Sequence, residues 1–335
     1  MNLRRCTQCI LPETFPNISF NESGVCNFCL SADSPADQAK IRKNLKKDLE
    51  QVLSNHRGQN NYDCIVAFSG GKDSSYTLYL LKTIYNMNCL AITIDNGFIA
   101  DQAVQNCKTV TDALHVDHIF FKPSKDYMEK MYTTSLSEDV HNPAALKRAS
   151  SICNSCISLI NNNMIKTALQ MKIPLIAGGY ISGQVPKDTV TYPLNLDRKI
   201  KSDKKLIENY TKHFGIESKK YFGIESLNQD TKITLLNPLL AVDYNENEII
   251  ETIKTIGWVP PVNTGKNSSN CLLNDLGIHS HFKKFKFNPY VNELADLVRQ
   301  GQMDRDEALE KVIAIPETKD LDEQMKKLGI NDEQL

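Results

Sequence analysis

The residues best suited to chemistry lie in one short segment, residues 69–74, between an apolar run and an amphipathic segment. Two adjacent glycines let the backbone turn tightly, so that successive N–H groups point toward one anion. The helix expected after them adds unpaired N–H donors and the positive end of its dipole. The loop consists of Ser69, Gly70, Gly71, Lys72, Asp73 and Ser74. We expect it to bind phosphate; an ordinary turn would need only the glycines and one capping side chain.

Two further positions follow predicted strands and are expected at the same edge of the sheet. Asp95 ends the apolar run 89–94, and Gly178 follows the run 174–177. Ligands of open parallel sheets bind outside the carboxyl ends of the strands. We therefore expect Asp95 to line a nucleotide site and Gly178 to allow close approach of a ligand, although both could serve only as turn residues.

Six of the ten cysteines form three C-x-x-C pairs. In a reducing compartment such pairs indicate metal binding or catalysis before disulfides. Two pairs are separated by sixteen residues, which matches the spacing of a zinc knuckle. These four ligands are Cys6, Cys9, Cys26 and Cys29. Four thiolates leave no open coordination position, so we expect structural Zn²⁺ in this site.

The third pair, Cys153 and Cys156, lies just before a helix predicted over residues 157–171, which would lower the pKa of both thiols. A distant cysteine, Cys271, follows the polar run 267–270. Three thiolates could hold a [4Fe–4S] cluster with one iron open. Two of them could instead carry persulfide and disulfide chemistry. A second zinc site that lacks its fourth ligand, or cysteines without a ligand, are the simpler interpretations.

Short apolar runs alternate with helical segments along most of the chain. The runs 63–68, 89–94, 117–121, 174–177 and 234–237 predict strands buried on both faces. This alternation predicts an α/β fold, a parallel sheet sandwiched by helices. We divide the chain into a zinc knuckle (1–35), a helix and linker (36–60), the α/β domain (61–260) and a C-terminal loop and helical extension (261–335). The polar stretch 187–229 is expected to be an irregular or helical insertion.

Composition excludes several classes of protein. Lys and Arg number 39 against 40 Asp and Glu, a net charge of −1 that argues against a dedicated nucleic-acid binder. No apolar run approaches the roughly 20 residues of a membrane span. The first residues lack the apolar region of a secretory signal, so we expect a cytoplasmic protein.

The loop 69–74, placed after a first strand, resembles the pyrophosphate-binding loop of the PP-loop ATP pyrophosphatase superfamily. The resemblance implies an adenine nucleotide alpha hydrolase-like fold. It also implies an enzyme that splits ATP into AMP and pyrophosphate and activates a substrate oxygen as an adenylate. It assigns the six loop residues to pyrophosphate and Mg²⁺, with Lys72 and Asp73 as catalytic residues.

The chain is similar to the N-acetyl sugar amidotransferases of bacterial surface-sugar synthesis nearly from end to end, though loosely through the middle. The similarity lies in residues 5–9, 24–29, 62–74 and 299–308. It implies that an acetamido oxygen is adenylated and that ammonia from a partner glutaminase replaces it. Cys271 departs from that family. Together with Cys153 and Cys156 it resembles the iron–sulfur thiolation enzymes of the same superfamily, in which sulfur is the nucleophile.

We therefore predict an adenylating enzyme that replaces a carbonyl or amide oxygen with nitrogen. The alternative is an iron–sulfur-dependent sulfur transferase that thiolates a small molecule or a tRNA base and uses Cys153, Cys156 and Cys271 as catalytic residues. A nucleotide sensor without turnover is a third hypothesis. The expected partners are a nucleotide-linked or acidic N-acetyl sugar, a glutaminase or sulfur donor, and a second copy of the chain; nucleic acid is disfavoured, and no membrane is expected.

Overall fold

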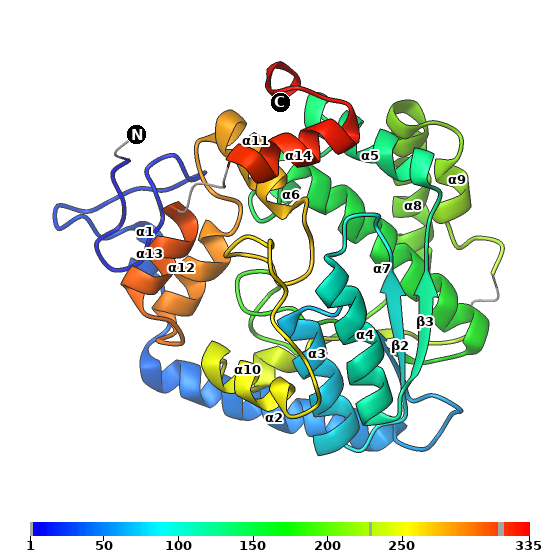
Figure 1. Cartoon of the computed structure of the whole chain (residues 1–335). Coiled ribbons are helices and arrows are strands. Elements are labelled where there is room, and N and C mark those ends of the chain that lie inside the picture. The colour runs from blue at the N-terminus through cyan, green and yellow to red at the C-terminus, as the bar shows by residue number, and fades with distance from the viewer. Residues whose placement is uncertain (1–2, 228–229, 314–317) are drawn as a thin grey trace.

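A computed structural model describes residues 3–227, 230–313 and 318–335 of the chain. Within these residues, one sheet of six strands has the order β3-β2-β1-β4-β6-β5. Figure 1 shows β2 and β3 side by side at one edge of this sheet. Neighbouring strands run parallel from β3 to β6, and β5 pairs antiparallel with β6. The strands are β1 (Cys64–Ala67), β2 (Cys89–Ile94), β3 (Asp117–Phe121), β4 (Leu175–Ala177), β5 (Thr191–Pro193) and β6 (Thr234–Leu236).

Helices precede, connect and follow the strands. Those before and within the sheet are α1 (Asn27–Leu30), α2 (Pro35–His56), α3 (Lys72–Tyr79) with η1 (Leu80–Ile84), α4 (Asp101–Leu114), α5 (Lys125–Ser137), α6 (Pro143–Leu146), α7 (Ser151–Met171), α8 (Leu196–Phe214) and α9 (Ser218–Tyr221). After the last strand come η2 (Pro238–Ala241), α10 (Glu246–Lys254), α11 (Asn274–Phe285), α12 (Val291–Arg299), α13 (Arg305–Ile313), α14 (Thr318–Leu328) and η3 (Asp332–Gln334). In the described part of the chain, no helix has the length and apolar character that crossing a membrane requires.

The two faces of the sheet contribute to two separate hydrophobic cores. Ile65 of β1 belongs to a core shared with α5, α7 and α8. Its neighbours Cys64 and Val66 belong to the other core, with side chains from α2, α3 and α4. Successive side chains of a strand point to opposite faces, so an uninterrupted apolar run fits a strand covered on both sides. The predicted parallel sheet sandwiched by helices is thereby confirmed.

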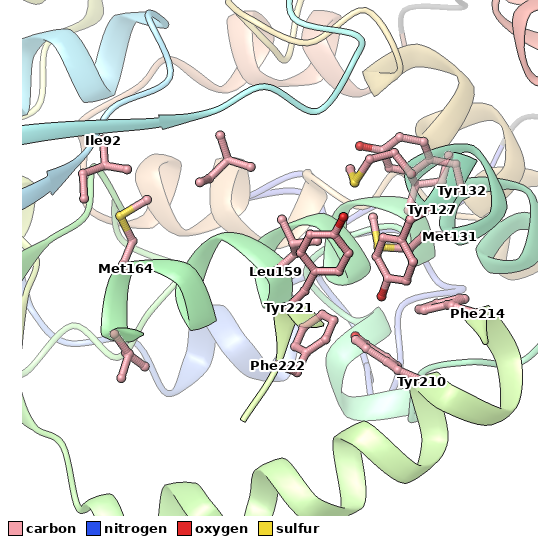
Figure 2. Close-up of a cluster of buried hydrophobic side chains, with 14 of the residues drawn as sticks. Ile92, Tyr127, Met131, Tyr132, Leu159, Met164, Tyr210, Phe214, Tyr221 and Phe222 are labelled. Atoms are coloured by element: carbon pink, nitrogen blue, oxygen red, sulfur yellow. The ribbon is translucent and has the colours of Figure 1, made fainter. Parts of the chain in front are cut away.

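An aromatic cluster fixes the segment after β5 against one face of the sheet. Figure 2 shows rings of α5, α8 and the α9 region gathered beside Leu159 of α7. The rings of Tyr210 and Phe214 lie 4.8 Å apart, and those of Tyr127 and Tyr221 lie 4.6 Å apart. The expected insertion 187–229 is thus largely helical and packed, with β5 added to the sheet edge; residues 228–229 lie outside the described part.

The N-terminal cysteine segment packs against the C-terminal helices, as Figure 1 shows beside α12 and α13. The guanidinium of Arg305 donates to the carbonyl oxygens of Cys9 and Cys6, at 2.9 and 3.1 Å. The two ends of the sequence therefore pack against each other.

Two elements differ from the sequence expectation. Helix α7 begins at Ser151, because the Ser150 hydroxyl accepts the Cys153 N–H and caps it; Cys153 and Cys156 are therefore within the helix and not before it. Strand β3 is less buried than its apolar sequence suggests: its last three residues, Ile119 to Phe121, are each more than a third exposed, because the strand lies at the edge of the sheet.

Candidate functional site

The loop 69–74 forms the predicted turn between β1 and α3, and its backbone is held from behind. Gly70 adopts φ +72°, and a Cβ there would lie 2.0 Å from the Ala103 carbonyl oxygen of α4. The Gly70 carbonyl accepts the Trp258 indole N–H at 3.0 Å and the Asn106 amide at 3.2 Å. Only glycine fits this conformation and this close approach.

A cavity of about 340 Å³ lies against the loop, at the carboxyl ends of β1, β2 and β4. From β1 the chain continues to β2 and β3 on one side of the sheet, and it then crosses to β4 on the other side of β1. Ligands of open α/β sheets bind at such a switch point. Predicted site residues that line the cavity are Ser69, Gly71, Asp73, Ser74, Cys153, Cys156, Gly178 and Cys271.

Three predicted residues lie elsewhere. Gly70 faces α4, as described above. The Lys72 ammonium group lies 2.5 Å from the Tyr244 hydroxyl, and its side chain is 12% exposed. The Asp95 carboxylate pairs with Lys122 at 3.0 Å and accepts the Gly97 N–H, as a turn residue would. In this conformation none of the three lines the cavity.

The segment that contains Ser268 and Ser269 lies over the loop 69–74, which we call the phosphate loop after its expected ligand. The sequence does not indicate this contact. The hydroxyl of Ser269 accepts the backbone N–H of Lys72 at 2.8 Å. Ser268 in turn accepts the backbone N–H of Cys271 at 3.2 Å. The segment that carries Cys271 is therefore joined to the phosphate loop, and a phosphate oxygen reaches the Lys72 N–H only by replacing the Ser269 hydroxyl.

The three distant cysteines meet in the same cavity. The amide nitrogen of Asn96 lies 3.5 Å from the Cys271 sulfur and 3.9 Å from the Cys156 sulfur. The Tyr132 hydroxyl is 3.9 Å from Cys156, and Cys153 lines the cavity one helical turn before it. The structure thus brings together residues from the start of α7 and the loop before α11.

Burial sets the protonation of these thiols. Burial, with a smaller contribution from the neighbouring cysteines, raises the pKa of Cys153 to about 11 and that of Cys156 to about 12. The expected lowering of both pKa values by the helix start is therefore wrong, because loss of solvation outweighs the helix dipole. The three cysteines form no disulfide, and three free thiols at one cavity wall fit the ligands of a [4Fe–4S] cluster that leaves one iron open.

Glu293 of α12 also lines the cavity, although its sequence context carried no signal beyond an amphipathic helix. Its carboxyl is buried, which raises its pKa to about 8 with a further contribution from Asp73. Gln184 and the more distant Lys72 and Arg148 oppose that rise. A carboxyl that titrates near neutral pH beside the phosphate loop is a candidate acid–base group.

The N-terminal cysteines form a second, separate cluster. The sulfur atoms of Cys6, Cys9, Cys26 and Cys29 all lie within 4.8 Å of one another. Burial opposes ionisation of Cys6, but N–H groups of Cys9 and Cys26 point at its sulfur and lower its pKa to about 7. Four close sulfurs, one of them predisposed to ionise, fit a tetrahedral metal site.

Comparisons with known proteins identify the family. A model of the queuosine biosynthesis protein QueC matches residues 63–274, and a model of the LPS biosynthesis protein WbpG-like C-terminal domain matches residues 278–335. An uncharacterized protein of Methanocaldococcus jannaschii is 26% identical over 329 residues, which cover 97% of this chain and 99% of that protein.

Two solved structures share low identity with the chain. The U34-tRNA thiolase NcsA from Methanococcus maripaludis, with its [4Fe–4S] cluster, is 18% identical over 99% of both chains, with a TM-score of 0.37. The NMN synthetase from Francisella tularensis is 11% identical over 89% of this chain and 98% of that one, with a TM-score of 0.38. The QueC model covers more than half of the sequence. The chain therefore belongs to the QueC family of the PP-loop ATP pyrophosphatase superfamily, and it is an enzyme of that ATP-using superfamily.

Proposed function

We propose that this enzyme splits ATP into AMP and pyrophosphate and transfers AMP to a carbonyl or amide oxygen of a small-molecule acceptor. One observation carries the proposal: the phosphate loop, the three thiols and a buried carboxyl line one cavity at the switch point of the sheet. A cavity of about 340 Å³ is of the size that small-molecule and cofactor sites have.

In the first step, the transfer of AMP to the acceptor, different residues bind pyrophosphate and Mg²⁺. Backbone N–H groups of the loop 69–74 hold the pyrophosphate, and Asp73 at the cavity wall supplies a carboxylate for Mg²⁺. Bound Mg²⁺ would offset charge on the departing pyrophosphate. The acceptor oxygen attacks the α-phosphorus, the bond from that phosphorus to the pyrophosphate oxygen breaks, and pyrophosphate leaves.

Nitrogen is the atom that we propose for the second step. Ammonia adds to the activated carbon, the bond between that carbon and the AMP-bearing oxygen breaks, and AMP leaves with the oxygen. The match of residues 278–335 to the WbpG-like domain supports an acceptor of the N-acetyl sugar class, since WbpG is described as an LPS biosynthesis protein. A glutaminase partner would supply the ammonia.

Sulfur is the second candidate, and the three thiols favour it. Cys153, Cys156 and Cys271 share a cavity wall with the phosphate loop. A [4Fe–4S] cluster held there would supply sulfide as the nucleophile through its open iron. The residues would hold the cluster and exclude water from it.

We further propose that the four N-terminal cysteines hold structural Zn²⁺ and that residues 1–35, 36–60, 61–260 and 261–335 act as the four units expected above. Zinc bound by four thiolates is closed to substrate. In this proposal the knuckle stabilises the C-terminal helices and takes no part in adenylation.

The test uses anaerobically purified full-length protein. ATP, Mg²⁺ and a panel of N-acetyl sugars are supplied with ammonium or with sulfide, and AMP and pyrophosphate are measured. Cys271→Ser separates the two candidates, because nitrogen transfer survives it and sulfur transfer is abolished. The control is Cys89→Ser, which changes a buried thiol at the start of β2 that does not line the cavity. ATP that binds without turnover under every condition would favour a nucleotide sensor.

A further inference from the structure

Tyr244 lies behind the phosphate loop and joins its two charged side chains. Its hydroxyl donates to the Asp73 carboxylate at 2.8 Å and lies 2.5 Å from the Lys72 ammonium nitrogen. The same ammonium group lies 5.1 Å from the centre of the Tyr244 ring. Tyr244 is 5% exposed and does not line the nucleotide cavity, so it reaches that site only through these two residues.

A second charged pair completes the network. Glu246, at the start of α10, lies 3.5 Å from the Lys72 ammonium group through one oxygen. Its other oxygen pairs with Lys311 of α13 at 2.6 Å. Lys311 also pairs with Glu307 of its own helix at 3.6 Å. The network therefore contains two ammonium groups and three carboxylates, and it ties the phosphate loop to the C-terminal helices.

The hydrogen bonds of the network run in one direction, from Lys72 through Tyr244 to Asp73. An ammonium group can only donate a hydrogen bond, and a carboxylate can only accept one. The Tyr244 hydroxyl therefore accepts from Lys72 and donates to Asp73.

We propose that Tyr244 is a positioning residue for the phosphate loop, which holds the Asp73 carboxylate at the cavity wall for the Mg²⁺ that accompanies ATP. The inference rests on the proposed use of ATP. Of the two loop side chains, Asp73 lines the cavity while Lys72 is retained in the network. Tyr244 holds both side chains in these positions, because its hydroxyl donates a hydrogen bond to one oxygen of Asp73 and accepts one from the Lys72 ammonium group.

Glu246 is expected to weaken the binding of anions at the loop. It neutralises part of the Lys72 charge, and Lys311 compensates only the far oxygen. Replacement by glutamine keeps the shape and removes one negative charge near the loop. Glu246→Gln is therefore expected to tighten the binding of inorganic pyrophosphate without metal, by about threefold to tenfold.

The experiment measures binding by titration calorimetry, with α,β-methylene-ATP as the probe, in Mg²⁺ and in EDTA. Tyr244→Phe keeps the ring and removes the hydroxyl. Because hydrogen bonds to charged groups are strong, we expect roughly tenfold weaker binding in Mg²⁺ and a much smaller change in EDTA. The control is Tyr127→Phe, which removes another buried hydroxyl that donates to Ser218 at 3.2 Å, far from the loop in sequence and in a different core.

Each outcome decides a separate point. If the wild-type protein binds no nucleotide, the proposed function fails and this inference fails with it. If the wild type binds and Tyr244→Phe binds equally well in Mg²⁺, only the inference is overturned. An equal loss in Mg²⁺ and EDTA would show a purely structural role and also overturn it. If Tyr244→Phe does not fold, Glu246→Gln decides: tighter pyrophosphate binding supports the network, and unchanged binding refutes it.

Discussion

The buried carboxyl of Glu293 predicts a stability that depends on pH. Its pKa is about 8 in the folded protein, raised first by burial, against an ordinary value of 4.5. Between these pH values the unfolded chain loses the proton and the folded chain keeps it. Ionisation therefore favours the unfolded state, and the fold loses stability as the pH rises from about 4.5 to about 8.

Glu293→Gln removes this effect, because an amide of the same shape does not ionise. Each tenfold difference in proton affinity corresponds to about 1.36 kcal/mol, so the span up to pH 8 gives at most roughly 5 kcal/mol. Local relaxation around a buried charge reduces that figure, and we expect about 2–4 kcal/mol. The variant should thus be more stable than the wild type at pH 8–9, and nearly equal to it at pH 5.

Denaturant unfolding at five pH values from 5 to 9 measures the difference in the free energy of unfolding. Glu251→Gln is the control, because the Glu251 side chain is 72% exposed on α10. It should show no comparable trend. A difference between Glu293→Gln and wild type that stays constant from pH 5 to pH 9 would refute the assignment of a raised pKa to this carboxyl.

Three further predictions follow from the loop and the N-terminal cluster. Gly70→Ala should lower the free energy of unfolding by more than about 3 kcal/mol and abolish nucleotide binding, since its Cβ would meet the Ala103 carbonyl oxygen. Gly97→Ala is the control: Gly97 has φ +81° and no atom nearby, so the loss should be only about 1 kcal/mol. Thermal unfolding measures both variants. Trp258→Phe should lower the free energy of unfolding by about 1–2 kcal/mol, because the Gly70 carbonyl loses a hydrogen-bond donor. The same variant should bind nucleotide more weakly in calorimetry. Metal analysis should find one zinc per chain, and Cys26→Ser should lose it together with several degrees of thermal stability; full retention of both would contradict a structural site.

The sequence predicts the fold best where the pattern is local. The loop 69–74 is a continuous segment, and its predicted position between a strand and a helix is confirmed by β1 and α3. The four N-terminal cysteines are likewise specified by their own spacing, and the sheet by its apolar runs. In these cases the neighbours in space are also neighbours in sequence, or belong to one repeated pattern.

The sequence does not predict residues that meet only through tertiary packing. Tyr244 and Ser269 contact the loop 69–74, and Glu293 lines the same cavity. These three residues lie about 170 to 220 positions after the loop, and none belongs to a recognisable motif. The sequence likewise does not indicate that Lys72 lies against Tyr244, and the role of Lys72 at pyrophosphate stays a prediction. The start of α7 is different, since Ser150 is a capping residue type that the sequence shows directly.

In the proposed function, the turn between β1 and α3 holds the phosphates of ATP. A crystal structure of the full chain with α,β-methylene-ATP and Mg²⁺ tests it most directly. We predict the terminal phosphates on the backbone N–H groups of residues 69–74, with Ser269 displaced and the α-phosphorus facing the side of the cavity that carries the thiols. A nucleotide bound elsewhere, or a cavity that stays free of it at millimolar concentration, would contradict the account.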